Sequence, residues 1–366
     1  MKKIVFYISS LERGGAERVF VNLAHDMYEH GYRVAVVTQY QGENEYELNE
    51  QIPRLLSDLT DDELHAGRIA NFVARLKKLR KIFKEQSADL IMTCNGKSNM
   101  MALAASLGLH CRVVLSVIAD PMMEYYTKAM RLIARTFFVM ADGIVVQTEE
   151  VKNFFPPCIR KKCKRLPNSL NPAFVRNRYE GSRKKEIVSV GRLDENKNQE
   201  MLIRAFEKIE KQFPEYNLIL YGEGEMRDRL EKLVKEFGLE EKVFLPGKVT
   251  NVADAINAVE IFVLTSYTEG MPNALLEAMA LGLAVISTDC PSGGPRSLIC
   301  DGDNGRLIPP GDTKALEEAL FALLENDEYR NTLGANAMKI QENLCPDKVN
   351  QMWREYFQNI MDGKGK

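Results

Sequence analysis

The feature that most constrains the fold is an alternation of short apolar runs with amphipathic segments, which occurs in two regions of the chain. In the first region, the runs KIVFYIS and YRVAVVTQ flank residues 16–30, where apolar residues recur with helical spacing. The runs DLIMTC, RVVLSVI and GIVVQT follow. Strands that alternate with helices of about 10–15 residues predict parallel sheets with helices on both faces.

The second region begins near Lys185 and repeats the pattern. Its strand candidates are EIVSVGR, NLILYGEG, KVFLPGKV, IFVLTS and AVISTD, separated by helical segments such as 200–213 and 227–237. A chain of 366 residues is also longer than one hydrophobic core usually serves. We therefore predict an α/β fold of two Rossmann-like, parallel-sheet domains.

The domain boundary is expected within 168–185, a stretch that is rich in Asn, Pro, Arg and Lys and has no sustained periodicity. It separates an N-terminal domain, residues 1–170, from a C-terminal domain, residues 171–346. Residues 347–361 form a last amphipathic helix, whose apolar side includes Trp353 and Phe357 and must pack on another part of the chain.

Composition excludes several classes of protein. Apolar residues at 45% and charged residues at 27% are typical of a globular protein, and a net charge of −2 argues against nucleic-acid binding. The seven cysteines form no CxxC pair, which favours reduced thiols over a disulfide framework or a zinc site. The N-terminus lacks the features of a signal peptide, and no run approaches about 18 apolar residues. We expect a cytoplasmic protein.

Ligands of open α/β sheets bind at the carboxyl ends of the strands, where loops lead into helices. The first such loop contains Gly14 and Gly15. The glycines let the backbone approach a ligand, and the helix N-terminus that follows attracts anions. The alternative is a simple tight turn, since the loop does not have the GxGxxG pattern of a dinucleotide site.

The second loop, 191–198, reads GRLDENKN after a strand. Arg192 can form two hydrogen bonds with phosphate oxygens, and Lys197 adds a second positive charge. Two cations at a strand end suit a diphosphate. The alternative is a solvated loop in which these cations pair with Asp194 and Glu195.

The third loop lies in SYTEGMPNALLEAMALGLAVIST, residues 266–288, and contains two glutamates in an apolar stretch. Pro272 fits the first position of a helix, and the N–H groups of 273–275 would then form an anion site. Glu277, one turn further on, can accept hydrogen bonds from the vicinal hydroxyls of a ribose. Glu269 directly precedes the kink that 270–272 are expected to form. The alternative makes Glu277 an exposed helix residue and Glu269 a turn residue.

Together these motifs resemble the retaining glycosyltransferases of the GT-B fold, glycosyltransferase family 4. EGMPNALLE is similar to the E-x7-E motif of that family, and VGRLDENKN, YGEGEMRDRLE and PGKVTNVADAINAVEIFVLTSYTEG occur in the family's order. The resemblance covers nearly the whole chain and is densest in 188–311.

The resemblance implies two Rossmann-like domains that face each other across a cleft, with a UDP-sugar held mainly by the C-terminal one. It implies catalytic roles for Arg192, Lys197 and Glu269, with Arg192 and Lys197 on the donor diphosphate and Glu277 on the ribose. The full set of implied donor-binding residues is Gly14, Gly15, Gly191, Arg192, Lys197, Lys248, Val249, Thr250, Glu269, Gly270, Met271, Pro272, Asn273, Ala274 and Glu277. The C-terminal helix of such enzymes typically crosses back to the first domain.

One segment departs from the family. Many members have a histidine in the loop after the strand that corresponds to 112–117, and a subgroup making bacterial surface polysaccharides has a pattern like S-x-R-N-D-P. Here Ile118 and Ala119 replace the Arg and Asn, whereas Asp120 and Pro121 remain. We therefore add Asp120 to the predicted catalytic residues.

The resemblance implies a mechanism without a metal ion or another cofactor, in which the leaving phosphate accepts the proton of the acceptor hydroxyl. Cations and a helix N-terminus would stabilise the departing diphosphate. Asp301 and Asp303 form a DxD sequence, but they lie in the turn DGDNGR, so we predict no metal site there.

Residues 68–84, RIANFVARLKKLRKIFK, predict a basic amphipathic helix. It suits an anionic membrane surface, and the alternative is a helix packed on the sheet with a solvated basic face. Because family members with such patches often use lipid-linked acceptors, we expect a peripheral enzyme on the inner face of the membrane that extends a polyprenyl-diphosphate glycan. Its predicted membrane contacts are Arg68, Arg75, Lys77, Lys78, Arg80, Lys81 and Lys84.

The leading hypothesis is thus a retaining, metal-independent hexosyltransferase that uses a UDP-hexose or UDP-N-acetylhexosamine. Two alternatives stay open at this point: a nucleotide-sugar epimerase of similar architecture, and a GT-B partner subunit that binds without catalysing transfer.

Overall fold

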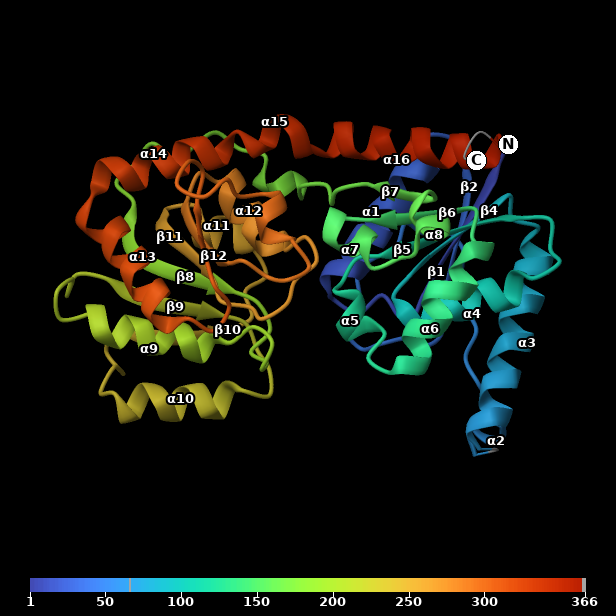
Figure 1. Ribbon diagram of the computed structural model, residues 1–366, viewed down its shortest axis with the longest axis horizontal. Helices are drawn as coiled ribbons and strands as arrows, with labels where there is room; N and C mark the ends of the chain where they lie inside the picture. Colours follow the sequence, from blue (N-terminus) through green and yellow to red (C-terminus); the bar gives the residue numbers. More distant parts are fainter. Residues whose placement is uncertain (66, 364–366) are drawn as a thin grey trace. The chain divides into compact units, whose positions relative to one another are not determined.

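The computed structural model describes residues 1–65 and 67–363. The chain forms two compact units (Figure 1). The first unit consists of Met1–Asn168 with the C-terminal stretch from Asp347, and the second unit consists of Ser169–Pro346.

The first unit contains a seven-stranded parallel sheet in the order β3-β2-β1-β4-β5-β6-β7. Its strands are β1 (Lys3–Ile8), β2 (Arg33–Thr38), β3 (Arg54–Leu56), β4 (Leu90–Cys94), β5 (Arg112–Val117), β6 (Gly143–Val146) and β7 (Cys163–Arg165). Its helices are α1 (Gly15–Glu29), α2 (Asp61–His65), α3 (Arg68–Gln86), α4 (Gly96–Ser106), α5 (Pro121–Glu124), α6 (Lys128–Phe137), the 3-10 turn η1 (Phe138–Met140), α7 (Glu149–Asn153), α8 (Pro157–Arg160) and α16 (Pro346–Met361).

The interior strand β1 is apolar on both faces, as a strand covered by helices requires, and Ile4 to Ile8 are buried. The last helix, α16, packs on this unit. The ring of Phe357 lies 6.3 Å from that of Phe6, and Lys2 Nζ lies 2.6 Å from Asp362 Oδ1. The helix therefore supplies part of the core of the first unit.

The second unit contains a six-stranded parallel sheet in the order β10-β9-β8-β11-β12-β13. Its strands are β8 (Lys184–Val190), β9 (Asn217–Tyr221), β10 (Val243–Gly247), β11 (Val259–Leu264), β12 (Ala284–Thr288) and β13 (Arg306–Ile308). Its helices are η2 (Pro172–Phe174), α9 (Gln199–Ile209), α10 (Arg227–Glu236), α11 (Val252–Ile256), α12 (Asn273–Ala280), η3 (Pro295–Ser297), α13 (Thr313–Glu325), α14 (Asp327–Met338) and α15 (Ile340–Leu344).

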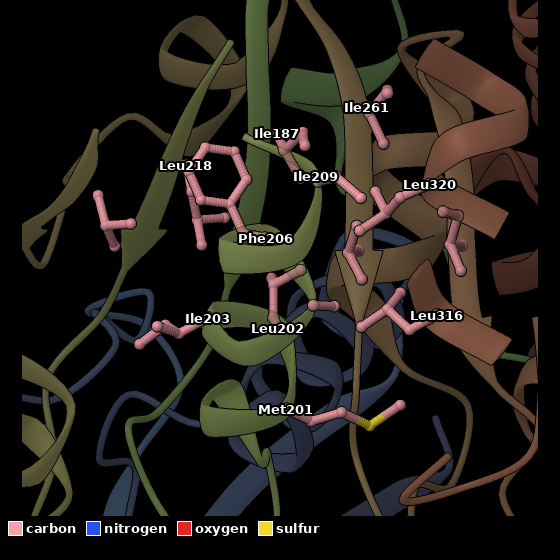
Figure 2. Packing of buried hydrophobic residues seen from close by; sticks show 14 of the residues in the cluster. Ile187, Met201, Leu202, Ile203, Phe206, Ile209, Leu218, Ile261, Leu316 and Leu320 are labelled. Carbon is pink, nitrogen blue, oxygen red and sulfur yellow. The ribbon is translucent and has the colours of Figure 1, made fainter. Parts of the chain in front are cut away.

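Helix α9 fills the core on one face of the second sheet. Its residues Leu202 and Phe206 pack with Ile187 and Leu218 of the sheet and with Leu320 of α13 (Figure 2). The strand order reverses between β8 and β11, which are hydrogen-bonded neighbours. In open α/β sheets a ligand crevice forms at such a reversal, beyond the carboxyl ends of the strands.

The structure confirms the predicted α/β class with two parallel sheets, and every strand candidate forms a strand. Three strands were not predicted, namely β3, β7 and β13, each of three residues. One boundary was wrong: α12 begins at Asn273, so Pro272 precedes the helix instead of occupying its first position.

Candidate active site

The loops that follow β8 and β11 meet at the reversal point of the second sheet, and Asn196 joins them. Its side chain accepts a hydrogen bond from Thr268 N (3.0 Å) and donates one to Thr268 O (2.9 Å). Its main-chain oxygen accepts a third from Tyr267 N (2.8 Å). Asn196 thus holds the loop that carries Lys197 against the loop that carries Glu269.

Lys197 and Glu269, which are 72 residues apart in the sequence, form an ion pair between these loops. The two side chains are only 18% and 12% exposed. Ser266 Oγ also donates a hydrogen bond of 2.6 Å to the same carboxylate oxygen of Glu269. A half-buried ion pair is costly to desolvate and is retained only where its geometry is good. The pair therefore fixes a lysine ammonium group at the ligand edge of the sheet.

The loop after β12 supports the kink that follows Glu269. Ser292 Oγ donates a hydrogen bond to the main-chain oxygen of Glu269, and Thr288 Oγ1 donates one of 2.6 Å to Ser266 O. A Cβ atom on Gly294 would lie 1.4 Å from Gly270 O. Only glycine allows this approach, although its backbone torsions there are ordinary ones.

Helix α12 starts directly after the kink, and no side chain caps its N-terminus. Helix N-termini with available N–H groups attract anions. Glu277 lies one turn into this helix and is 5% exposed, whereas Met271 contributes its side chain to the core. The structure thus rejects the alternative in which Glu277 is an exposed helix residue.

Arg192 lies at the end of the same sheet edge but points into solvent. Its side chain is 80% exposed, and its Nη2 lies 3.2 Å from Asp194 Oδ2. Asp194 also accepts a hydrogen bond of 2.9 Å from Lys197 N. The pairing with Asp194 was the predicted alternative, but an exposed pair contributes only about 0–1 kcal/mol. Arg192 therefore loses little if it exchanges Asp194 for another anion.

The remaining residues predicted in the second unit lie on adjacent loops. Gly191 packs against Lys197, since a Cβ at Gly191 would contact the lysine Cε at 3.4 Å. The stretch 248–250 follows β10, and Lys248 and Thr250 are exposed there. Gly222 N donates a hydrogen bond of 2.9 Å to Gly247 O, which joins the ends of β9 and β10.

A cavity of about 420 Å³ borders the loop after β8. Asp194, Glu195 and Tyr267 contribute to its wall, together with the beginning of α9. Lys197, Glu269 and Glu277 do not line it. The cavity is thus a neighbour of the cluster formed by Lys197, Glu269 and Glu277 and does not coincide with it.

In the first unit, Gly14 immediately precedes α1, so no side chain caps the N-terminus of this helix. The loop around Gly14 and Gly15 is held by Glu45, which accepts a hydrogen bond of 3.2 Å from Leu11 N and forms an ion pair with Arg54. The hydrogen bonds from Arg54 lower the pKa of Glu45 to about 2. Neither Glu45 nor Arg54 was predicted, because nothing in the sequence marks their pairing.

Asp120 also belongs to the first unit. Its carboxylate caps α5 by accepting a hydrogen bond of 2.8 Å from Met122 N. Ile118, at one of the positions that depart from the family, lines a small cavity with Phe20 and Trp353. Its apolar side chain thus has a packing role.

Glu124, at the end of α5, is an ionisable residue that the sequence analysis missed. Both of its carboxylate oxygens are buried. Burial raises the pKa of Glu124 to about 8, although the nearby Gly96 N–H lowers it to a smaller extent. Glu124 is therefore largely uncharged at neutral pH.

The DxD sequence forms a turn. Asp301 Oδ1 lies 3.0 Å from Arg306 Nε and accepts a hydrogen bond of 2.9 Å from Leu307 N. Nowhere in 1–65 and 67–363 do three or more His, Cys, Asp or Glu side chains gather as metal ligands would. The seven cysteines are free thiols. No described helix is both long and apolar enough to span a bilayer.

Two family models match successive parts of the chain. The model of the glycosyltransferase family 4 matches residues 13–174, and that of the glycosyl transferases group 1 matches residues 174–340. The chain is 28% identical, over 98% of its length and 99% of the relative's, to a Campylobacter jejuni GalNAc-alpha-(1->4)-GalNAc-alpha-(1->3)-diNAcBac-PP-undecaprenol alpha-1,4-N-acetyl-D-galactosaminyltransferase.

A second Campylobacter jejuni relative is 28% identical over 90% of this chain and 92% of its own. It is an N-acetylgalactosamine-N,N'-diacetylbacillosaminyl-diphospho-undecaprenol 4-alpha-N-acetylgalactosaminyltransferase. Among solved structures, Anabaena HepE in complex with UDP and glucose superimposes with a TM-score of 0.83 at 20% identity, over 98% of this chain and 100% of HepE. These matches confirm the resemblance seen in the sequence and the GT-B fold. The chain belongs to the group 1 glycosyltransferases of family 4 and is a retaining, metal-independent glycosyltransferase.

Proposed function

We propose that the protein transfers a hexose or N-acetylhexosamine from a UDP-sugar to a polyprenyl-diphosphate-linked glycan during the assembly of a surface polysaccharide or glycan. The observation that carries the proposal is the half-buried pair of Lys197 and Glu269 beside the start of α12. The two Campylobacter relatives, whose names specify undecaprenyl-diphosphate-linked acceptors, support the choice of acceptor.

The donor diphosphate is assigned to Lys197, Arg192 and the N-terminus of α12. Lys197 is held in place by Glu269, whereas Arg192 is exposed and can turn from Asp194 to a phosphate. The main chain of Gly270, Met271, Pro272, Asn273 and Ala274 is assigned to the sugar and the β-phosphate. Glu277 is assigned to the ribose hydroxyls, and 248–250 to the base.

The reaction needs stabilisation of negative charge on the departing UDP. A preorganised donor aimed at developing charge is typically worth about 2.7–4 kcal/mol. The Lys197 ammonium group has this character, because Glu269 and the bonded loops fix it before the reaction begins. The leaving phosphate is then the group that accepts the proton of the acceptor hydroxyl. Gly14 and Gly15 are assigned to donor binding, and Asp120 to the catalytic residues.

The polyprenyl acceptor implies contact with a membrane, for which we propose the cations of α3. The first turns of this helix are exposed, since Ile69 is 83% and Phe72 50% exposed, while Leu79 and Phe83 near its end are buried. A groove lined by Ile69, Val73 and Lys77 lies there. Basic and exposed apolar side chains on one helix suit an anionic membrane surface.

A transfer assay tests the function. The protein is incubated with UDP-glucose, UDP-galactose, UDP-GlcNAc or UDP-GalNAc and a water-soluble short-chain polyprenyl-diphosphate glycan. We expect UDP release and an α-linked product, identified by mass and by NMR of the anomeric proton, with or without EDTA. A sugar converted in the absence of acceptor would instead identify an epimerase, and UDP-sugar binding without transfer to any acceptor would identify a non-catalytic partner subunit.

Replacing Glu277 by alanine tests the nucleotide assignment separately. We expect Glu277→Ala to lose the thermal stabilisation that UDP gives the wild-type protein, because ligand binding to the native state raises its melting temperature. The exposed Glu240→Ala of the same unit serves as the control and keeps that stabilisation. Unchanged UDP binding by Glu277→Ala would refute the ribose role.

A further inference from the structure

A second exposed apolar surface lies in the first unit, between β5 and β6, and the proposed function leaves it unused. It is formed by α5, the residues between α5 and α6, α6 and η1. Figure 1 shows the positions of α5 and α6. Its exposed apolar residues, with the exposed fractions, are Met122 (51%), Met123 (62%), Tyr126 (61%), Leu132 (65%), Ile133 (44%), Val139 (43%) and Met140 (46%). Apolar residues that cluster in this way mark interaction sites, whereas scattered ones are ordinary.

Helix α6 divides into three stripes along its length. Met130, Ala134 and Phe137 face the core. Leu132 and Ile133 form an exposed apolar stripe, and Lys128, Arg131 and Arg135, spaced at i, i+3 and i+7, form a basic stripe beside it. An apolar stripe bordered by cations is the pattern of a helix that lies in a membrane interface.

The positive charge of this surface is not neutralised within the protein. Residues 125–141 contain no acidic residue. Of the flanking acids, Glu124 has buried oxygens, and Asp142 pairs with Arg112 at 2.8 Å. Among the ion pairs of the described residues, none involves Lys128, Arg131 or Arg135; Arg135 lies over the Phe154 ring at 5.9 Å.

Packed aromatic rings lie beneath this surface. The ring of Tyr125 lies 5.8 Å from that of Phe138 and 6.0 Å from that of Phe154, with which it is stacked. Tyr125 and Phe138 are fully buried, so α5 and η1 are anchored at both ends of α6. The exposed residues are therefore held in place by the fold.

The comparison with α3 shows why this surface is the better membrane contact. In α3, Lys78 pairs with Glu63 at 2.6 Å, and Arg80 donates hydrogen bonds to the main-chain oxygens of Ala105 and Leu107. Lys78 and Arg80 thus already have partners within the protein, and Lys81 lies 3.9 Å from Glu85. The other α3 cations are in no ion pair of the described residues. At α6, all three cations lack such ion-pair partners among the described residues. Seven exposed large apolar residues adjoin them, whereas α3 has three, Ile69, Phe72 and Val73.

We propose that the surface formed by Met122, Met123, Tyr126, α6 and η1 docks on an anionic membrane and supplies the larger share of membrane affinity. The apolar side chains enter the interface between headgroups and acyl chains, and Lys128, Arg131 and Arg135 meet the anionic headgroups. The proposal deepens the proposed function, on which its biological purpose rests, but vesicle binding can be measured without catalysis.

The test is cosedimentation of the full chain with vesicles of one part phosphatidylglycerol to two parts phosphatidylcholine. We expect the triple variant Lys128→Gln, Arg131→Gln, Arg135→Gln to bind roughly a hundredfold more weakly, because each of the three cations near an anionic surface contributes about fivefold. We expect the double variant Leu132→Glu, Ile133→Glu to lose most of its binding and to retain only the smaller share that α3 supplies.

Two matched variants serve as controls. Lys211→Gln, Lys232→Gln, Lys235→Gln removes three exposed charges from the second unit and is expected to bind like wild type. Lys77→Gln, Lys81→Gln, Lys84→Gln removes three from α3 and is expected to lose less binding than the α6 variant. Circular dichroism and an unchanged melting temperature verify the folding of each variant.

The proposal is overturned if both α6 variants bind like wild type, if the second-unit control loses as much as the α6 triple variant, or if α3 alone accounts for binding. A dimer that Leu132→Glu, Ile133→Glu dissociates would assign the surface to a second copy of the chain and would also overturn it. Transfer to a water-soluble acceptor should survive in the α6 variants. Its absence already in the wild-type protein would instead count against the proposed function.

Discussion

The two units share one architecture but differ at the carboxyl edges of their sheets. In the second unit, the loops after β8, β11 and β12 are bonded to one another through Asn196, the pair of Lys197 and Glu269, and Ser292. In the first unit, the segment after β5 ends in α5 and α6, which expose apolar and basic side chains to solvent. The loops after β8, β11 and β12 thus form a bonded network, whereas the segment after β5 forms an exposed surface.

The difference shows how a repeated fold acquires two tasks. A small charged ligand requires donors that are fixed before it arrives, and this fixing comes from bonds between loops. A membrane requires exposed area and unpaired charge, which a bonded network would remove. The predictions below test this division of roles.

The largest effect is expected at Lys197. Replacement by alanine removes a fixed cation from the donor edge, so we expect transfer activity to fall by about 10²–10³. The fall should appear mainly in kcat, because the charge it stabilises develops in the transition state. Steady-state kinetics with saturating acceptor measure it.

Two measurements distinguish a loss of catalysis from a loss of folding. Circular dichroism at the assay temperature should show that Lys197→Ala is folded, although its melting temperature falls because Glu269 loses its cation. Lys208→Ala, which replaces an exposed lysine of α9, should keep full activity. A Lys197→Ala enzyme with wild-type kcat would show that the bonded edge is only structural.

A smaller effect, on stability, is expected at Gly294. Alanine there would place a Cβ atom 1.4 Å from Gly270 O, so the loops after β11 and β12 must move apart. We expect the free energy of unfolding to fall by about 1–3 kcal/mol. Urea denaturation measures it, and Gly191→Ala, whose Cβ would have an ordinary contact at 3.4 Å, is the control. Equal stability of the two variants would mean that the edge is not tightly packed.

The last effect concerns Glu124 in the first unit, and its size depends on pH. Its pKa is raised from 4.5 to about 8, so the folded protein keeps a proton that the unfolded chain releases above pH 4.5. The stability contributed by protonated Glu124 is complete below pH 4.5 and is lost as pH rises toward about 8, at up to about 1.4 kcal/mol per pH unit. We expect Glu124→Gln to remove this slope.

Urea denaturation across that pH range measures the slope, with the exposed Glu85→Gln as the matched variant. If Glu124→Gln and wild type followed the same pH dependence, Glu124 would be ionised in the folded protein. The first unit would then contain a buried charge of its own. The two units would no longer differ in this respect.

Much of the fold could be predicted, because buried parallel strands are apolar on both faces and appear in the sequence as continuous runs. Strands β3, β7 and β13 escaped prediction because each has only three residues and lies at an edge of its sheet. Arg54 of β3 illustrates the reason: it is a polar residue whose partner, Glu45, is determined by tertiary contact.

The site was predictable where a residue's chemistry follows from its place in a loop, and not where it depends on a distant partner. Lys197 and Glu269 were each proposed for the site, but their pairing across 72 residues was not foreseen. The supporting roles of Asn196 and Gly294 likewise depend on the order of strands, which determines which loops become neighbours. No local pattern encodes that order.

The packing of α16 has a consequence for the folding of the protein during its synthesis. The ring of Phe357 completes the core around Phe6, yet the ribosome synthesises it only after the whole of the second unit. At about 5–20 residues per second, this leaves the core of the first unit without α16 for roughly ten seconds or more. The second unit can therefore reach its native state before the first, which reverses the order in which the two emerge from the ribosome.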